Sequence, residues 1–158
     1  QRDRIDEYLA AYLPHLEQHA AELARLYDGV IDMLDALAKR RIPLAVLSNK
    51  PHGATVALVD QLMGAQRFAE VRGQLPGAAV KPDPAAALEI TANLDATAER
   101  TLYVGDSDVD MQTAHNAGLT AVGAAWGLRG RAELQAHDAD HIIDHPLDLV
   151  PLVDRLSG

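Results

Sequence analysis

The sequence has no cysteine, and it has too few basic residues to balance its acidic ones. Without cysteine the chain can form neither a disulfide nor a thiolate metal site. Its 14 lysines and arginines stand against 23 aspartates and glutamates, which gives a formal net charge of −9. Because nucleic-acid backbones require a basic binding surface, we expect no generic nucleic-acid partner.

Long hydrophobic runs are missing as well. No apolar stretch approaches the length of a membrane span, and residues 1–4 (Gln-Arg-Asp-Arg) do not resemble the start of a signal peptide. We therefore expect no membrane partner and a cytoplasmic location. The sequence does not begin with methionine, so we expect the native start to lie elsewhere.

Apolar residues make up 48% of the 158 residues, which is enough for a real core and excludes wholesale disorder. Segments with helical spacing of apolar residues alternate with short apolar runs typical of buried strands. This alternation predicts an α/β fold, a Rossmann-like parallel sheet with helices on both faces. The expected helices cover residues 3–24, 29–40, 53–63, a segment from Asp83 onward, a segment ending at Gly118, and the C-terminus; the expected strands cover residues 44–47, 70–73, 102–104, 121–124 and 141–143.

Residues 105–110 (Gly-Asp-Ser-Asp-Val-Asp) place three carboxylates directly after one of these strands. Open α/β sheets build their sites at the carboxyl ends of their strands. Like charges so close together need a cation or hydrogen-bond donors, and a hard ion such as Mg²⁺ prefers oxygen ligands. The alternative is helix capping, which accounts for one aspartate better than for three.

Three further polar residues lie at strand ends or in the loop between them. Ser48 and Asn49 follow the strand at residues 44–47, and Lys81 lies in the loop before the helix that begins near Asp83. A hydroxyl, an amide and an ammonium group suit a phosphate, while carboxylates suit its metal. Taken singly, Ser48 and Asn49 also fit a turn before a proline, and Lys81 also fits a solvated loop.

Three segments in this order resemble motifs two, three and four of the haloacid dehalogenase-like hydrolase superfamily. They are residues 47–50 (Leu-Ser-Asn-Lys), residues 81–84 (Lys-Pro-Asp-Pro) and residues 105–110. The similarity is greatest to the phosphoglycolate phosphatase-like branch, and it extends to residues 117–119, 126–129 (Trp-Gly-Leu-Arg) and 139–143. It covers roughly residues 26–158, and its strength lies in the order and spacing of the set.

The resemblance implies a role for each of these residues. Ser48, with Asn49 beside it, matches the phosphate-binding position, and Lys81 matches the lysine that steadies the nucleophile and the transferring phosphoryl group. Asp106 matches the direct Mg²⁺ ligand. Asp110 matches the second acid of that motif, which supports either the metal site or Lys81.

The first motif of the family, an Asp-x-Asp pair at the end of a first strand, is not found in this sequence. In the family its first aspartate attacks phosphorus and forms an aspartyl-phosphate, and its second is the general acid/base. We therefore expect residues 1–22 to be the remnant of a helical cap domain and residues 23–158 to be an α/β core that lacks its first strand. That strand would lie between those ending at Ser48 and Asp106, so we expect these two not to pair directly.

These features predict a Mg²⁺-dependent phosphomonoester hydrolase that acts on a small phosphorylated metabolite, with its nucleophile upstream of this chain. One alternative is a phosphosugar mutase on the same fold. The other is an inactive fragment or regulatory domain that binds Mg²⁺ or phosphate without turnover.

Overall fold

The computed structural model describes residues 24–157, and these fall into two compact parts. The first contains residues 44–78, and the second contains residues 27–43 and 79–157. The predicted helix over residues 3–24 and the predicted cap remnant lie almost wholly outside the described residues. No helix in residues 24–157 has the length and apolar character needed to cross a membrane.

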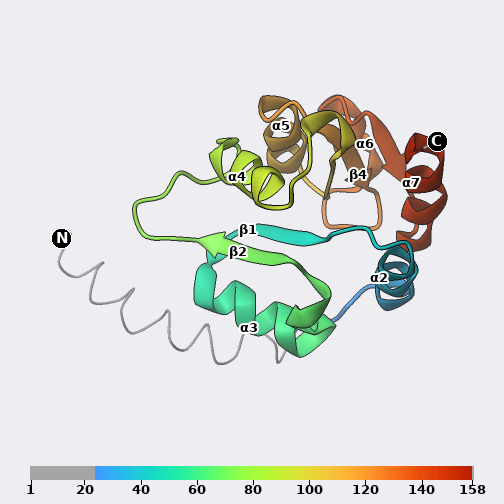
Figure 1. Ribbon diagram of the computed structural model, residues 1–158. Coiled ribbons are helices and arrows are strands. Elements are labelled where there is room, and N and C mark those ends of the chain that lie inside the picture. The colour runs from blue at the N-terminus through green and yellow to red at the C-terminus, as the bar shows by residue number, and fades with distance from the viewer. Residues whose placement is uncertain (1–23, 158) are drawn as a thin grey trace. The chain divides into compact units, whose positions relative to one another are not determined.

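The first part is a parallel strand–helix–strand unit (Figure 1). Strand β1 (Ala45–Pro51) leads into helix α3 (His52–Met63), and a short 3₁₀ turn, η1 (Ala65–Arg67), precedes strand β2 (Glu70–Gln74). The two strands pair in parallel, as alternating strands and helices predict. Strand β1 is longer than expected, because it continues through Ser48 and Asn49 to the proline that precedes α3.

The carboxyl end of β1 is held by close contacts with β2 and α3. Thr55 donates hydrogen bonds to the carbonyl oxygens of Lys50 (3.2 Å) and Pro51 (3.0 Å). A side chain on Gly73 of β2 would come within 2.5 Å of the Thr55 hydroxyl oxygen and 2.6 Å of the Lys50 carbonyl oxygen. A glycine is therefore needed where β2 passes the turn that follows Ser48 and Asn49.

The second part is built on three parallel strands in the order β3–β4–β5. Strand β3 (Leu102–Gly105) is followed by helix α5 (Asp108–Asn116), strand β4 (Thr120–Ala124), helix α6 (Gly130–Ala136) and strand β5 (His141–Ile143). Its core includes fully buried side chains from α5, β4 and α6: Met111, Ala114, Ala121, Val122 and Leu134. The sequence did not predict α6, whose seven residues contain only one buried side chain, Leu134.

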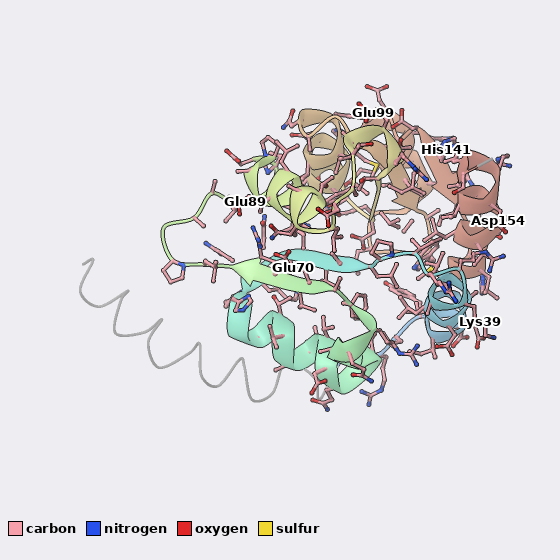
Figure 2. All side chains as sticks on the ribbon, in the orientation of Figure 1. Lys39, Glu70, Glu89, Glu99, His141 and Asp154 are labelled. Carbon is pink, nitrogen blue, oxygen red and sulfur yellow. The ribbon has the colours of Figure 1, made fainter. Side chains whose placement is uncertain are left out.

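The second part contains three more helices and two short 3₁₀ turns. They are α2 (Val30–Lys39), α4 (Ala85–Asn93) and α7 (Leu149–Ser157), with 3₁₀ turns η2 (Ala98–Arg100) and η3 (Pro146–Asp148). Helix α4 begins at Ala85 with Pro84 as its N-cap residue, so the prediction of Asp83 as the N-cap is wrong by one residue. The Asp83 carboxylate still accepts a hydrogen bond from the Ala85 N–H (2.9 Å), the first N–H of the helix. Figure 2 labels Asp154 on α7, which accepts two 2.7 Å bonds from Arg40, the residue after α2.

Strands β1 and β3 do not pair with each other. Among the described residues, β1 pairs with β2 alone and β3 pairs with β4 alone. The described residues therefore form one two-stranded and one three-stranded sheet. Direct pairing of β1 with β3, which would have contradicted the expected missing strand, is not observed among them, and the missing strand stays a prediction.

Candidate active site

The turn between β3 and α5 carries the three carboxylates that the sequence singled out. Ser107 is the N-cap residue of α5. Its hydroxyl oxygen accepts a hydrogen bond from the Asp110 backbone N–H, with 3.4 Å between nitrogen and oxygen. The same hydroxyl donates to Oδ2 of Asp110 at 2.7 Å. The capping that we weighed against metal binding is therefore done by Ser107, which leaves the aspartates available for other contacts.

Asp110 is the buried centre of this turn, with 7% of the residue exposed. One oxygen accepts from Nζ of Lys81 (2.7 Å), and the other accepts from the Ser107 hydroxyl and from the backbone N–H of Asp106 (3.2 Å). A side chain on Gly105 would overlap the Asp110 side chain, so this packing requires glycine at the end of β3. Burying a carboxylate is costly unless it is paired and hydrogen-bonded, and here it is both.

Lys81 is held in place by its surroundings. Only 13% of its side chain is exposed, and its Nζ lies 6.0 Å from the centre of the Tyr103 ring on β3. The amide of Asn116 donates to the Pro82 carbonyl oxygen (2.9 Å), which ties the loop to the end of α5. Burial, and to a lesser extent the Asp110 charge, raise the pKa of Tyr103, so this tyrosine stays neutral beside the ion pair.

Asp106 is oriented by the loop that follows β4. Its Oδ2 accepts a hydrogen bond from the backbone N–H of Leu128 at 2.9 Å. Gly127 packs so closely on Asp106 that a side chain there would overlap the carboxylate. The remaining oxygen, Oδ1, has no hydrogen-bond partner within residues 24–157, and neither has the Asp108 carboxylate.

These carboxylates can be tested against the requirements of a divalent cation. In the described part of the chain no three histidine, cysteine, aspartate or glutamate side chains form a complete metal cage. Mg²⁺ commonly binds one or two carboxylates and completes its octahedron with water and substrate phosphate. The available oxygen of Asp106 fits that requirement as one carboxylate ligand, and Asp108, two residues later, is a candidate for a second. The contacts of Asp110 are those of a residue that supports Lys81, and its binding to metal stays a prediction.

Ser48 and Asn49 belong to the first part of the structure. Ser48 is half-buried, and its hydroxyl oxygen accepts from the Lys50 N–H at 3.1 Å, as the turn interpretation predicts. Asn49 is exposed. The structure brings Lys81, Asp106 and Asp110 together in the second part, while the convergence of Ser48 and Asn49 with them stays a prediction.

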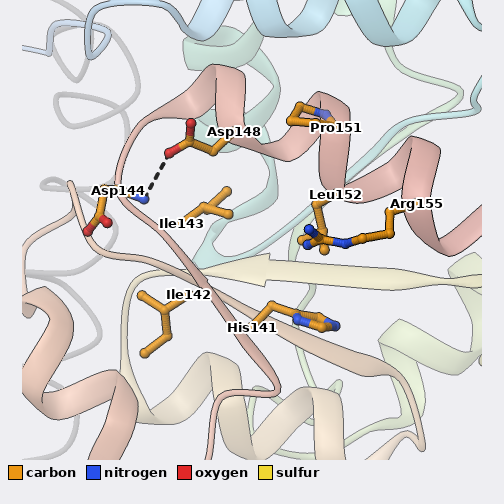
Figure 3. Close-up of a pocket in the computed structure, with 8 residues that line it drawn as sticks. All are labelled: His141, Ile142, Ile143, Asp144, Asp148, Pro151, Leu152 and Arg155. Carbon is orange, nitrogen blue, oxygen red and sulfur yellow. Dashed lines mark hydrogen bonds between the residues drawn. The ribbon is translucent and has the colours of Figure 1, made fainter.

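A shallow pocket of about 300 Å³ lies elsewhere in the second part, between β5 and α7 (Figure 3). His141 and Ile143 line it from β5, and Leu152 and Arg155 line it from α7. Asp148 closes one end, where it accepts a hydrogen bond from a neighbouring backbone N–H. None of the predicted site residues lines this pocket, so it is separate from the carboxylate turn.

Sequence reasoning missed three contributors to the site. Ser107 could have been found, because Ser-x-x-Asp ahead of a helix is close to the capping-box pattern. Gly127 and the Leu128 N–H left no such signal. Their role depends on the loop after β4 returning to the residue that follows β3, because Leu128 contacts Asp106, 22 residues earlier in the sequence.

Comparisons with known proteins identify the family of this chain. A sequence profile described as haloacid dehalogenase-like hydrolase matches residues 1–124. The chain is 30% identical over 156 residues to the pyrophosphatase PpaX of Bacillus mycoides and 33% identical over 149 residues to a phosphoglycolate phosphatase of Pseudomonas putida. These matches cover 98% and 94% of this chain, and they span 72% and 55% of the two relatives.

Among solved structures, a predicted phosphoglycolate phosphatase from Haemophilus somnus superposes with a TM-score of 0.85 at 25% identity. The superposition covers 96% of this chain and 68% of the other. The α/β fold predicted from the alternation of strands and helices is thereby confirmed.

Proposed function

Because the chain belongs to the haloacid dehalogenase-like hydrolase family, we propose that it forms most of the core of a Mg²⁺-dependent phosphomonoester hydrolase. The observation that carries this proposal is the Asp110 network, which holds the Lys81 ammonium and the Asp106 backbone on one buried carboxylate. A cation and a carboxylate prepared for a metal are thus positioned at one strand end. Phosphoryl transfer depends mainly on such positioning and on electrostatic stabilisation.

Each residue of the network has a distinct task in this proposal. Lys81 neutralises charge on the transferring phosphoryl group, and Asp110 holds its ammonium in place. Asp106, with Asp108 beside it, binds Mg²⁺, which when bound offsets the negative charge of the phosphate. The Leu128 N–H and Gly127 fix the direction of the Asp106 carboxylate.

Ser48 and Asn49 complete the proposed phosphate site from the end of β1. A hydroxyl and an amide can donate to phosphate oxygens without adding charge. The close packing of Gly73 and Thr55 behind Lys50 supports the turn from which they would do so. Their neutral hydrogen bonds are weaker than the charge-assisted bond from Lys81, so they orient the phosphate more than they stabilise it.

The nucleophile in this proposal is the first aspartate of an Asp-x-Asp pair at the end of a first strand, and no Asp-x-Asp pair in residues 1–158 stands in that position. In the complete protein that aspartate would attack phosphorus, displace the alcohol and form an aspartyl-phosphate. Water would then release inorganic phosphate and restore the carboxylate.

The proposed substrate is a small phosphorylated metabolite of the phosphoglycolate type. The two relatives above act, by their names, on phosphoglycolate and on pyrophosphate. The experiment measures phosphate release by the complete protein from 2-phosphoglycolate, pyrophosphate and a hexose 6-phosphate, with and without Mg²⁺. We expect Mg²⁺-dependent release that is fastest with 2-phosphoglycolate.

Two results would contradict the proposal. Phosphate release that persists at the same rate in EDTA would exclude the Mg²⁺-dependent reaction. Transfer of the phosphoryl group to a sugar, with no free phosphate, would identify a mutase. The matched control is Lys39→Ala, which removes an exposed lysine from the end of α2 and should leave the rates unchanged.

A further inference from the structure

The connection from β4 to α6 contains Gly127 in its loop and Gly130 as the first residue of α6, and the two glycines are needed for different reasons. Gly130 has a φ of +73°, and a side chain there would meet nothing within 4 Å. Gly127 is not in the left-handed region, but a side chain there would come within 2.5 Å of Oδ2 of Asp106 and 2.7 Å of its Cγ. Conformation therefore requires Gly130, and space beside Asp106 requires Gly127.

The backbone at this point also makes a directed contact with the same carboxylate. The Gly127 N–H donates to the Ala124 carbonyl oxygen (3.0 Å), which closes a tight turn at the end of β4. The next N–H, from Leu128, then points at Oδ2 of Asp106 at 2.9 Å. Leu128 is 87% exposed, and its contact with the site is made by its backbone N–H.

Asp106 is thus held on one side only. Its backbone N–H is fixed by Asp110, and its Oδ2 is fixed by Leu128, while Oδ1 has no hydrogen-bond partner in the described residues. A carboxylate held in this way presents one oxygen in a fixed direction. Because the carboxylate is already ordered, binding a cation there costs less conformational entropy than binding it to a mobile side chain, and the affinity is higher.

We propose that Gly127 and the Leu128 N–H are positioning groups that set the affinity of Asp106 for a divalent cation. The inference rests on the proposed function in one respect, the assignment of Asp106 as the metal ligand. It adds that the loop after β4 helps to set the affinity of Asp106 for the cation. Groups that orient a metal ligand typically change metal affinity about 10- to 100-fold when they are altered.

The test compares Gly127→Ala with Gly130→Ala in the complete protein. Titration calorimetry with MgCl₂ alone measures the dissociation constant, and thermal unfolding measures stability separately. We expect Gly127→Ala to weaken Mg²⁺ binding by about tenfold or more. Gly130→Ala, which strains the backbone without touching Asp106, should lower the melting temperature while the Mg²⁺ dissociation constant stays within about twofold of the starting value.

A second pair of variants covers the case in which Gly127→Ala does not fold. The double variant Gly127→Ala/Asp106→Gly removes the side chain that the new methyl group would meet, so it should regain the melting temperature of Asp106→Gly alone. An unchanged Mg²⁺ affinity in a folded Gly127→Ala protein would overturn the inference, as would a double variant no more stable than Gly127→Ala.

The proposed function and this inference can fail separately. Mg²⁺ binding that depends on Gly127, without phosphate release from any substrate, would refute the hydrolase and support the inference. Phosphate release that survives with unchanged Mg²⁺ affinity in Gly127→Ala would support the hydrolase and refute the inference. A starting protein that binds no Mg²⁺ would refute both.

Discussion

Asp110 binds three partners with one carboxylate, and this number of bonds explains why a charged side chain can be buried at the end of β3. Lys81 supplies the compensating charge, and Ser107 and the Asp106 N–H satisfy the remaining oxygen. Loss of one partner from such a buried pair leaves an uncompensated charge, which commonly costs about 3–5 kcal/mol of stability. Variants at this turn must therefore be examined for folding before their activity is compared.

The first prediction concerns Asp106 and its neighbour Asp108. Asp106→Asn should weaken Mg²⁺ binding at least about tenfold, because a neutral amide oxygen replaces a charged ligand while the bond from Leu128 can be kept. Asp108→Asn should have a smaller effect, since Asp108 follows the residue that caps α5 and is not held by Leu128. Calorimetry with MgCl₂ measures both dissociation constants. Equal affinity in Asp106→Asn and the starting protein would show that Asp106 is not the main ligand.

The second prediction compares Lys81 with Ser48 in the complete protein. Lys81→Ala should reduce kcat/KM by an amount equivalent to roughly 3 kcal/mol, the scale of one preorganised donor to a developing charge. Ser48→Ala should cost less, because it removes a neutral hydrogen bond. Steady-state kinetics on folded variants give both values. Negligible losses for both residues would contradict the proposed phosphate site.

At the scale of elements, helices α2 and α7 are joined by an exposed ion pair at their ends. Arg40 donates two 2.7 Å hydrogen bonds to Asp154, and these bonds lower the pKa of the Asp154 carboxyl. A lowered pKa in the folded state contributes stability above the ordinary aspartate pKa of about 4. This contribution to stability is lost as the pH falls below about 4 and through the lower pKa of Asp154 in the folded state.

The third prediction follows from the lowered pKa of Asp154. Asp154→Asn should lower the melting temperature slightly near pH 7, and the difference from the starting protein should disappear as the pH falls from about 4 toward 2. High salt should also reduce the difference at pH 7, because the pair is exposed and screened. Thermal unfolding monitored across this pH range measures it. A difference that grows on acidification would mean that Asp154 does not pair with Arg40 in solution.

For the whole molecule, the important feature is that the strands form two separate sets. Among the described residues β1 pairs with β2, β3 pairs with β4, and no ladder joins β1 to β3. Unpaired strand edges leave backbone donors and acceptors that another strand can satisfy. The family resemblance predicts a further strand, carrying the Asp-x-Asp pair, between the strands that end at Ser48 and Asp106, and this strand stays a prediction.

The fourth prediction is that residues 1–158 alone do not hydrolyse phosphomonoesters. The proposal assigns the nucleophile and the general acid/base to an Asp-x-Asp pair at the end of a first strand, which was not found in this sequence, and catalytic groups that act as a unit fail together. Phosphate release from 2-phosphoglycolate with Mg²⁺ should equal the rate of buffer alone, while the complete protein should be active. Robust Mg²⁺-dependent turnover by the 158-residue chain would mean that one of its own acids is the nucleophile.

Much of the fold followed from local patterns in the sequence. Short apolar runs such as residues 102–104 predicted strands, and the segment ending at Gly118 predicted a helix, because both periods are local properties of the chain. Helix α6 was not predicted, since a seven-residue helix with one buried residue has too short a pattern to recognise. The family assignment also came from the sequence, because the order and spacing of its motifs survive in the linear chain.

The tertiary structure decided which side chains of the site act on one another. The sequence predicted Lys81, Asp106 and Asp110 as site residues, but only the structure shows Asp110 bound to Lys81 and Leu128 bound to Asp106. These contacts join segments that are 29 and 22 residues apart, and their distances depend on strand register and loop path. Local sequence patterns determine which groups are present at each strand end, whereas packing between distant segments determines the direction in which those groups point.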